Sequence, residues 1–390
     1  MIPEVSGGRA TLPLRVFADL IMGQAPVGDS YNDTGHGLPL IAGAGDLGQV
    51  TPKPKKWTDS PTKVGQHGDI IVCVRATIGD LNWADRPYCY GRGVAAVRVK
   101  SGCEPHFIWY WLEACKQHLQ GLGRGATFKQ ISKEDLAELP TPDLPLPEQR
   151  RIVSRIKACM ERVEEIERDA AVASREIDAL FPAVLNERFD EIRAAHGLQA
   201  LEQAAVIRGG GSLPKGTSID QGDESVLLVK VGDMNIEGNE RVISVAREFL
   251  TKKEAGRNTI PAGAVVLPKR GGAIATNKKR MLGRPALIDP NLMAIVARQD
   301  VLRAEYLYYW CLTLDLATLS NGGVIPQLNR KDLAPLQVPM PPLDAQQHIV
   351  ESLKRSETYC GQLRAEFDAA QAERAQLRES ILRKAFAGEL

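Results

Sequence analysis

Basic side chains are the residues of this sequence whose type and spacing most suggest chemistry. Nine lysines and arginines lie between Lys252 and Arg284, against one acid, Glu254. Arginine and lysine bind guanine edges and phosphates, and asparagine binds adenine edges, so the segment predicts a nucleic-acid partner. The candidates in the first half of the chain are Lys53, Lys55, Lys56, Arg75, Arg92, Arg124 and Lys129. Those in the second half are Lys230, Lys269, Arg270, Asn277, Lys278, Lys279 and Arg280. For each residue alone, solvated surface charge is the alternative interpretation.

Two of these arginines occupy matching places. Arg75 follows the apolar run at 70–74, and Arg270 follows a similar run at 264–267. Such short β-rich runs, bounded by glycine, proline and aspartate, predict strands. Arg75 and Arg270 are therefore the best matched pair of base-contact or phosphate-contact candidates.

Motifs for catalysis or nucleotide binding are missing. The glycine-rich segments 121–125 and 209–216 fit neither GxxxxGK[ST] nor GxGxxG between a strand and a helix, so we interpret them as turns near DNA or simply as loops. We find no Asn-Pro-Pro-aromatic methyltransferase motif and no clear Asp/Glu-x-Lys nuclease arrangement. We expect no catalytic residue in this chain.

Cysteine and histidine usage argues against a metal site. The seven cysteines are an odd number, are widely spread and form no CxxC pair, and the six histidines form no ligand-spaced group. This pattern predicts reduced, mostly buried thiols and no bound metal.

The sequence contains an internal repeat. Residues 125–136 match residues 322–333, and the same difference of 197 positions carries Gln149 onto Gln346. Upstream the match is looser, as expected if surface loops differ in length. Each half therefore reads as a variable globular region followed by a more faithfully repeated helical region.

A heptad pattern runs through both helical regions. A period of seven sustained over four heptads predicts a coiled-coil seam, and a helix of about 40 residues would be roughly 60 Å long. The seam of the first helix comprises Ile152, Ile156, Val163, Ile166, Ile177 and Leu180. The seam of the second comprises Ile349, Leu353, Leu363, Phe367, Leu377 and Ile381.

These observations predict an α/β fold with two globular domains. The domains span 1–146 and 186–340, and helical spacers at 147–185 and 341–390 separate them. If the two spacers pack as an antiparallel coiled coil, the repeat gives a pseudo-two-fold axis. Two modules related in this way can meet one DNA duplex at separated half-sites. Because the globular halves differ more than the helical halves, we expect the half-sites to differ.

Composition places the chain among globular proteins of two or three domains. It has 390 residues, 44% hydrophobic and 25% charged residues and a net charge of +1. It contains no apolar run of the 18 residues that a membrane span needs and no secretory leader pattern. We expect a cytoplasmic protein without a membrane partner.

Several short segments form an ordered set of motifs. They are Ile21-Met22-Gly23-Gln24-Ala25-Pro26, Gly91-Arg92-Gly93-Val94-Ala95-Ala96, Phe128-Lys129-Gln130-Ile131-Ser132-Lys133, Pro145-Leu146-Pro147-Glu148-Gln149-Arg150-Arg151-Ile152-Val153 and the ending Ile381-Leu382-Arg383-Lys384-Ala385-Phe386-Ala387-Gly388-Glu389-Leu390. Taken in order, these segments resemble the specificity subunits of type I restriction-modification systems. Each segment is short, but their order and twofold recurrence are specific, and the resemblance covers essentially the whole chain.

The resemblance implies a set of partners. In this family two target-recognition domains each read half of a bipartite, asymmetric double-stranded DNA site, and the helices dock two modification subunits. Those subunits bind S-adenosylmethionine and methylate adenine, and a restriction subunit supplies ATP-driven translocation and cleavage. The resemblance thus implies a non-catalytic chain with no cofactor of its own.

Three other interpretations remain at this stage. A methyltransferase or nuclease would need chemistry that the chain lacks. A non-catalytic coiled-coil scaffold would need globular surfaces that are indifferent to DNA. A stand-alone DNA-binding regulator would share every DNA feature and lack only the modification partners.

Overall fold

The computed structural model describes the chain except for residues 1, 4–9, 126–128, 324 and 375. The chain forms two compact units: unit 1 comprises residues 1–170 with 369–390, and unit 2 comprises residues 171–368.

Unit 1 contains two four-stranded sheets. The first has the order β2-β9-β6-β7 and is antiparallel throughout; the second has the order β3-β5-β4-β8 and pairs β4 with β8 in parallel. The first sheet consists of β2 (Ala18–Met22), β9 (Val94–Val99), β6 (Ile70–Cys73) and β7 (Leu81–Trp83). The second consists of β3 (Tyr31–Asn32), β5 (Lys56–Thr58), β4 (Leu38–Ile41) and β8 (Cys89–Tyr90). The short helices are α1 (Leu14–Phe17), α2 (Pro105–Ala114), α3 (Lys116–Leu122) and α4 (Lys133–Ala137).

Strand β6 is buried on both faces, which explains its uninterrupted apolar sequence. Ile70 and Val72 pack in one hydrophobic cluster with helix α2, whereas Ile71 and Cys73 pack in another that contains the tyrosine Tyr90 of the second sheet. The first sheet therefore lies between a helical layer and the second sheet.

Unit 2 repeats this layering. Its five-stranded sheet has the order β12-β19-β16-β17-β14, and its three-stranded sheet has the order β15-β13-β18. The larger sheet consists of β12 (Ala205–Gly209), β19 (Leu292–Ala297), β16 (Val265–Pro268), β17 (Arg280–Leu282) and β14 (Val242–Ile243). The smaller consists of β15 (Phe249–Thr251), β13 (Ser225–Val229) and β18 (Ala286–Ile288). The short helices are α6 (Leu201–Ala204), α7 (Lys252–Ala255), α8 (Ala304–Leu312), α9 (Leu316–Leu319) and α10 (Arg330–Leu333).

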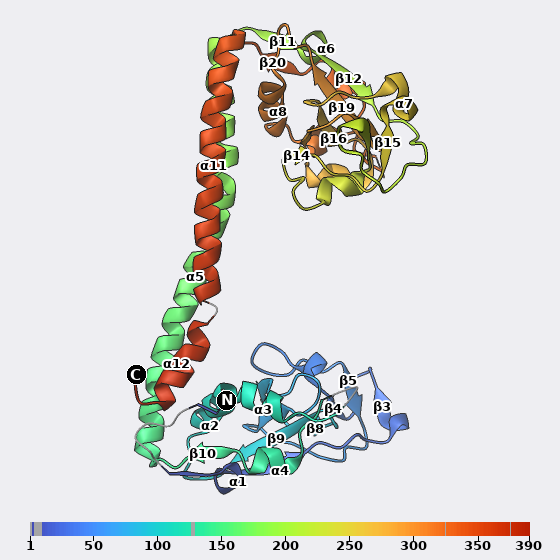
Figure 1. The fold of residues 1–390 in the computed structure, drawn as a ribbon. Helices are drawn as coiled ribbons and strands as arrows, with labels where there is room; N and C mark the ends of the chain where they lie inside the picture. The colour runs from blue at the N-terminus through green and yellow to red at the C-terminus, as the bar shows by residue number, and fades with distance from the viewer. Residues whose placement is uncertain (1, 4–9, 126–128, 324, 375) are drawn as a thin grey trace. The chain divides into compact units, whose positions relative to one another are not determined.

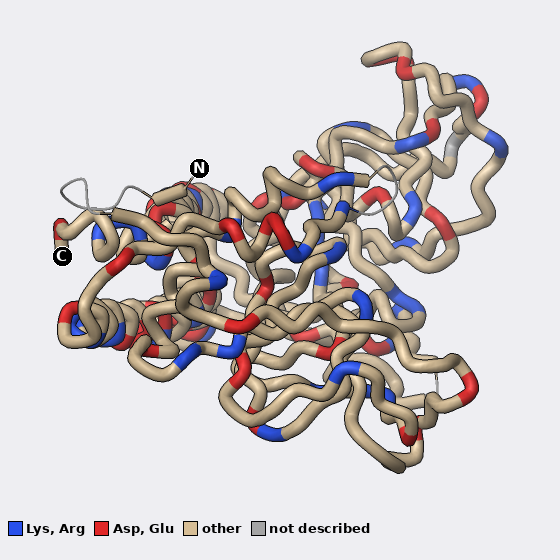
Figure 2. The backbone as a smooth tube through the Cα atoms, turned by 90° about the horizontal axis from the view of Figure 1, so that it is seen from below, with Lys and Arg blue, Asp and Glu red and all other residues tan. Residues whose placement is uncertain are grey.

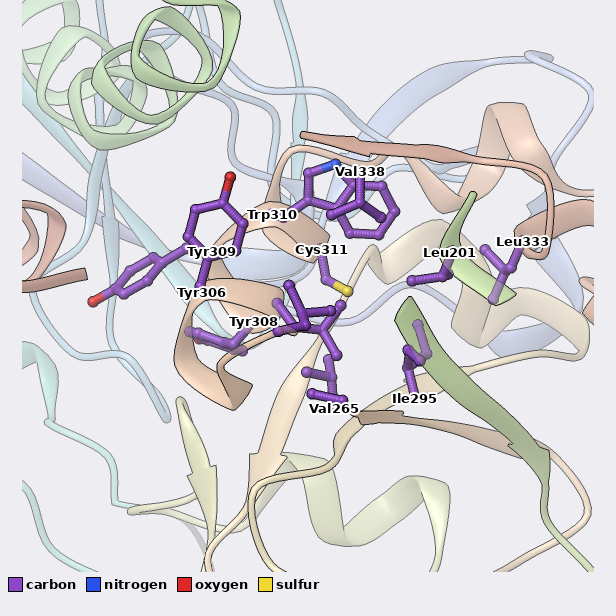
Figure 3. Packing of buried hydrophobic residues seen from close by; sticks show 14 of the residues in the cluster. Leu201, Val265, Ile295, Tyr306, Tyr308, Tyr309, Trp310, Cys311, Leu333 and Val338 are labelled. Carbon is purple, nitrogen blue, oxygen red and sulfur yellow. The ribbon is translucent and has the colours of Figure 1, made fainter. Parts of the chain in front are cut away.

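The core of unit 2 forms where the aromatic helix α8 meets the larger sheet. Figure 3 shows Cys311 directed toward Val265 of β16, and Tyr306, Trp310 and Ile295 of β19 belong to the same hydrophobic cluster. Every one of these five side chains is at most 2% exposed. The aromatic run at 306–310 is thus a buried helix, as its sequence predicts.

Long helices enter both units. α5 spans Leu146–Ala195, α11 spans Leu343–Arg374 and α12 spans Leu377–Phe386 (Figure 1). α5 continues beyond the predicted spacer boundary at residue 185, and the second predicted helix comprises α11 and α12.

The helix partners run antiparallel within each unit. In unit 2, β11 (Leu198–Ala200) follows α5 and pairs antiparallel with β20 (Gln337–Pro339), which leads into α11. Arg364 of α11 donates to Ser174 Oγ of α5 at 2.9 Å. In unit 1, β1 (Thr11–Pro13) pairs antiparallel with β10 (Pro140–Pro142), which leads into α5. Arg378 of α12 pairs with Glu167 of α5 at 3.0 Å, and Arg155, earlier in α5, donates to Leu390 O, after α12, so α12 runs opposite to α5.

The predicted seam is buried mainly where the helices meet the globular parts. The buried members are Ile152, Ile156, Val163, Ile349 and Leu353. The half-buried members are Ile177, Leu180, Leu363, Phe367 and Ile381. The prediction is wrong for Ile166, which is 42% exposed, and for Leu377, which is 36% exposed. Leu377 is the first residue of α12.

The repeat is preserved in hydrogen bonds. Gln149 Oε1 accepts from the backbone N of Glu104 at 2.8 Å, and Gln346 Oε1 accepts from the backbone N of Arg303 at 2.9 Å. Glu104 and Arg303 are the N-cap residues of α2 and α8. Each glutamine is buried and joins the aromatic helix of its unit to a long helix.

Candidate nucleic-acid interface

The matched arginines lie at equivalent kinks after the central strands. Arg75 follows β6 and forms a backbone bridge with Gln130, and Arg270 follows β16 and forms one with Gln327. The next residue has a positive φ in both units: 58° at Ala76 and 70° at Gly271. A non-glycine residue in this region is uncommon, so the shared kink shows that the two positions are structurally equivalent.

A cleft of about 660 Å³ opens beside Arg75 in unit 1. Tyr31, Arg92 and the backbone of Gly43 and Gly93 also line it. Gly93 is required for packing, because a Cβ there would lie 2.1 Å from the carbonyl oxygen of Ala42. The glycines thus let the loop backbones meet, and they leave the two arginines as the cationic groups of the cleft.

Both arginines of this cleft are available to a partner. Arg92 is exposed and Arg75 is half-buried, and neither side chain makes a hydrogen bond or ion pair with another described residue. A guanidinium without a counter-charge in an open cleft can make a bidentate contact to a guanine edge or a phosphate.

The corresponding region of unit 2, at the end of β16, carries different side chains. The backbone N of Val74 donates to Gly93 O at 2.9 Å in unit 1, and the backbone N of Lys269 donates to Asn291 O at 2.8 Å in unit 2. Lys269 is half-buried and Arg270 is exposed, and neither side chain pairs with another residue that the structure describes. Lys269 thus stands where unit 1 has Val74, so unit 2 has a side-chain cation at a position where unit 1 has none.

The glycine-rich segment 209–216 is a packed loop at its start. A Cβ on Gly210 would lie 1.8 Å from the carbonyl oxygen of Asp289. Gly209, Gly210 and Gly211 line a second cleft, of about 620 Å³, with Arg208. Here too a glycine, Gly210, permits close backbone approach.

The remaining basic candidates differ in whether another side chain pairs with their charge. Arg124 pairs with Asp135 at 3.0 Å, Lys230 pairs with Glu248, and Lys278 donates to Asn235 Oδ1. Four further candidates are exposed and make no such contact with other described residues: Lys53, Lys55, Lys56 and Lys129.

The structure corrects the prediction for Lys279. This side chain is 1% exposed, and its Nζ donates to Asn277 Oδ1 at 2.8 Å and to the carbonyl oxygen of Leu314. Arg280 is half-buried and donates to Lys279 O at 3.0 Å. Lys279, just before β17, therefore acts inside the fold instead of facing a partner, because its Nζ is held by the acceptors of Asn277 and Leu314.

Among the described side chains, part of the basic segment 252–284 is compensated by acids. Lys252 lies 3.8 Å from Glu224, and Arg284 forms a bidentate pair with Asp220, whose pKa this contact lowers to about 2. Positive and negative positions are interspersed along the chain (Figure 2). Acids distant in sequence thus compensate Lys252 and Arg284, while the contact of the segment with nucleic acid stays a prediction.

Gln130 and Gln327 are site residues that the sequence analysis missed. They bridge to the matched arginines, and Gln130 and Gln327 lie at the positions that the internal repeat aligns. Their recurrence beside a predicted site was the available signal.

Metal-ligating side chains and thiols are further groups whose chemistry bears on the site. No group of three or more histidine, cysteine or acidic residues among them could hold a metal ion. Burial raises the pKa of the Cys73 thiol to about 11 and of the Cys311 thiol to about 12, so these groups stay protonated near neutral pH. None of the helices described is both long and apolar enough to cross a membrane.

Comparison with known proteins defines the class of the chain. A family model described as the type I restriction modification DNA specificity domain matches residues 19–172 and again residues 251–366. The type I restriction enzyme EcoDI specificity subunit of Escherichia coli is 35% identical over 410 aligned positions, which cover 97% of this chain and 88% of that protein. The chain therefore belongs to the type I restriction-modification specificity subunits, whose role in these systems is non-catalytic.

Other relatives agree with this assignment. A protein of Methanocaldococcus jannaschii named as the MjaX type I restriction enzyme specificity subunit is 40% identical over 149 residues, 38% of this chain but only 35% of that protein. A solved structure of the HsdS subunit from Thermoanaerobacter tengcongensis matches with a TM-score of 0.62 at 22% identity, covering 99% of this chain and 98% of that one. A chain solved in work on complex assembly of the type I R-M system matches with a TM-score of 0.73 at 22% identity, covering 99% of this chain and all of that one. These structures share the predicted fold of two α/β domains with long helices.

Proposed function

We propose that each unit reads one half of a bipartite, asymmetric DNA site, with Arg75 and Arg270 as equivalent contacts. The observation that carries this proposal is their shared placement: both follow a central strand, both precede a positive-φ residue, and neither has a counter-charge among the described residues. The neighbouring loops differ, with Arg92 on one edge and Lys269 on the other, which favours two different half-sites.

The long helices are proposed to dock two modification subunits. Apolar side chains that a solvated helix would not need are exposed on them: Ile166 at 42%, Val172 at 47% and Tyr359 at 64%. Contiguous apolar surface marks protein interfaces, whereas single exposed apolar side chains are ordinary, so membership of the family carries this proposal and the three positions are its candidate contacts. S-adenosylmethionine, used to methylate adenine, and ATP, used by a restriction subunit, would bind these partners. Acting on cellular DNA, the chain would work in the cytoplasm.

Substitution of each arginine tests whether each unit reads its own half-site. The chain would be co-expressed with a cognate modification subunit, and the methylated motif would be read from sequencing of the host genome. Arg75→Ala is expected to relax one half of the motif and Arg270→Ala the other, since one bidentate base contact contributes about 1–3 kcal/mol of discrimination. A contact to phosphate would instead weaken methylation without changing the motif.

Arg298 supplies a matched control. Arg298 is exposed and directly follows the last residue of β19, Ala297. Arg270 lies near the other end of β19, where Leu292 pairs with Pro268. Arg298→Ala should leave both motif and level unchanged. If Arg75→Ala and Arg270→Ala alter the same half, or alter nothing, the proposal is wrong.

A further inference from the structure

A buried cation lies beside the arginine edge of unit 2. Lys279 is 1% exposed, and the contacts of its Nζ among the described residues are with Asn277 Oδ1 and Leu314 O, which carry no charge. Strand register shows which residue of unit 1 corresponds to Lys279. Val265 of β16 pairs with Met281, and its counterpart Ile70 of β6 pairs with Trp83. Lys279 lies two positions before Met281, so its counterpart is Leu81, two positions before Trp83. A leucine fills this place without the cost of desolvating a charge. The lysine therefore needs a reason other than core packing.

Hydrogen bonds show what the lysine holds. Asn277 Oδ1 accepts from Lys279 Nζ at 2.8 Å and from the backbone N of Leu316 at 2.9 Å. Asn277 itself has a positive φ of 52°, where asparagine is among the few non-glycine residues that are tolerated. One amide oxygen thus ties the end of segment 269–279 to the first residue of α9.

The other end of the same segment is tied to the chain that follows α9. Arg270 bridges Gln327, and Gln327 also bridges Asn321. The backbone N of Gly271 donates to Pro326 O at 2.8 Å. Segment 269–279, which carries Arg270 and Lys278, is therefore fixed to one neighbouring stretch of chain at both ends.

Unit 1 fixes its corresponding segment differently. Segment 74–80 between β6 and β7 is shorter, and Asp80 pairs directly with Lys116 of α3 at 2.6 Å. The longer segment of unit 2 contains a 3₁₀ helix, Gly271–Thr276, before the turn at Asn277. A longer loop has more conformations to restrict, so hydrogen bonds that fix the loop matter more in unit 2 than in unit 1.

We propose that Asn277 and Lys279 are positioning residues that hold segment 269–279 in the conformation in which Arg270 and Lys278 meet the DNA. The inference rests on the proposed function and adds the residues that set the specificity of one half-site. Both residues act through the segment between them and Arg270.

Asn277→Gly is the sharpest test, because glycine keeps the positive φ and removes only the side-chain acceptor. The variant would be tested in the full chain, co-expressed with a modification subunit. We expect methylation to rise about tenfold at sites that carry one altered base in the half-site read by unit 2. Recognition of the other half-site should not change. Asn277→Asp keeps the acceptor and should preserve the wild-type motif. Lys279→Met should behave like Asn277→Gly where thermal unfolding shows that the variant folds.

The outcomes separate this inference from the proposed function. Relaxation confined to one half-site, with Asn277→Asp unaffected, supports the positioning role. An unchanged motif in Asn277→Gly, or equal relaxation of both halves, overturns it. If the wild-type chain directs no two-part methylation, the proposed function itself has failed, and the positioning role fails with it.

Discussion

Replacement of Gln346 by methionine should show how strongly the buried glutamine joins α8 to α11. Its side chain accepts from Arg303 N at 2.9 Å and donates to Val301 O at 3.0 Å and Pro341 O at 2.9 Å. Methionine has a similar volume but leaves these three backbone groups unpaired. Since each buried unpaired group costs about 1–3 kcal/mol, we expect the free energy of unfolding of unit 2 to fall by about 3 kcal/mol or more.

Chemical denaturation together with hydrogen exchange measures this effect and locates it. The Arg303 amide should lose protection in Gln346→Met. Gln347→Met is the matched control, because that neighbouring side chain bonds only to Glu351 at 3.0 Å on the surface and should change stability by less than about 0.5 kcal/mol. A stability within 0.5 kcal/mol of wild type for Gln346→Met, or unchanged protection at Arg303, would refute the reasoning.

Two further substitutions test the packing and the buried charge. Phe386 is 3% exposed with its ring 4.8 Å from that of Trp111, so Phe386→Ala should lower the unfolding free energy of unit 1 by about 3–5 kcal/mol in urea; a loss below about 1 kcal/mol would contradict this packing. Burial lowers the pKa of Lys279 from 10.5 to about 8, opposed by Cys311 and Asp315. The folded state therefore loses this proton before the unfolded state does, and between pH 7 and 9.5 wild type should gain about 2 kcal/mol of stability relative to Lys279→Met. Urea denaturation at the two pH values checks this, and a difference that does not vary with pH would show that Lys279 titrates normally.

The repeat made much of the fold predictable. Matching positions 197 apart placed Gln149 and Gln346 in equivalent buried roles, and the apolar runs before Arg75 and Arg270 became equivalent central strands. These features depend on local sequence and period, which a single chain reveals. The two-sided burial of β6 follows from the same pattern.

The remaining features depend on contacts between residues far apart in sequence. Lys279 was predicted to face DNA, but its direction depends on strand register and on Leu314. The neutralisation of Arg284 depends on Asp220, 64 positions away. Composition along a window cannot show such pairs, which is why the basic segment looked more uniform in sequence than it is in the fold.

Methylome sequencing tests the central claim most directly. A host that expresses a cognate modification subunit would be sequenced with and without this chain. The account predicts adenine methylation at one asymmetric, two-part motif that appears only when the chain is present. Purification of a modification subunit that forms no complex with the chain, together with no such motif in the genome, would contradict it and favour a stand-alone DNA-binding protein or a scaffold.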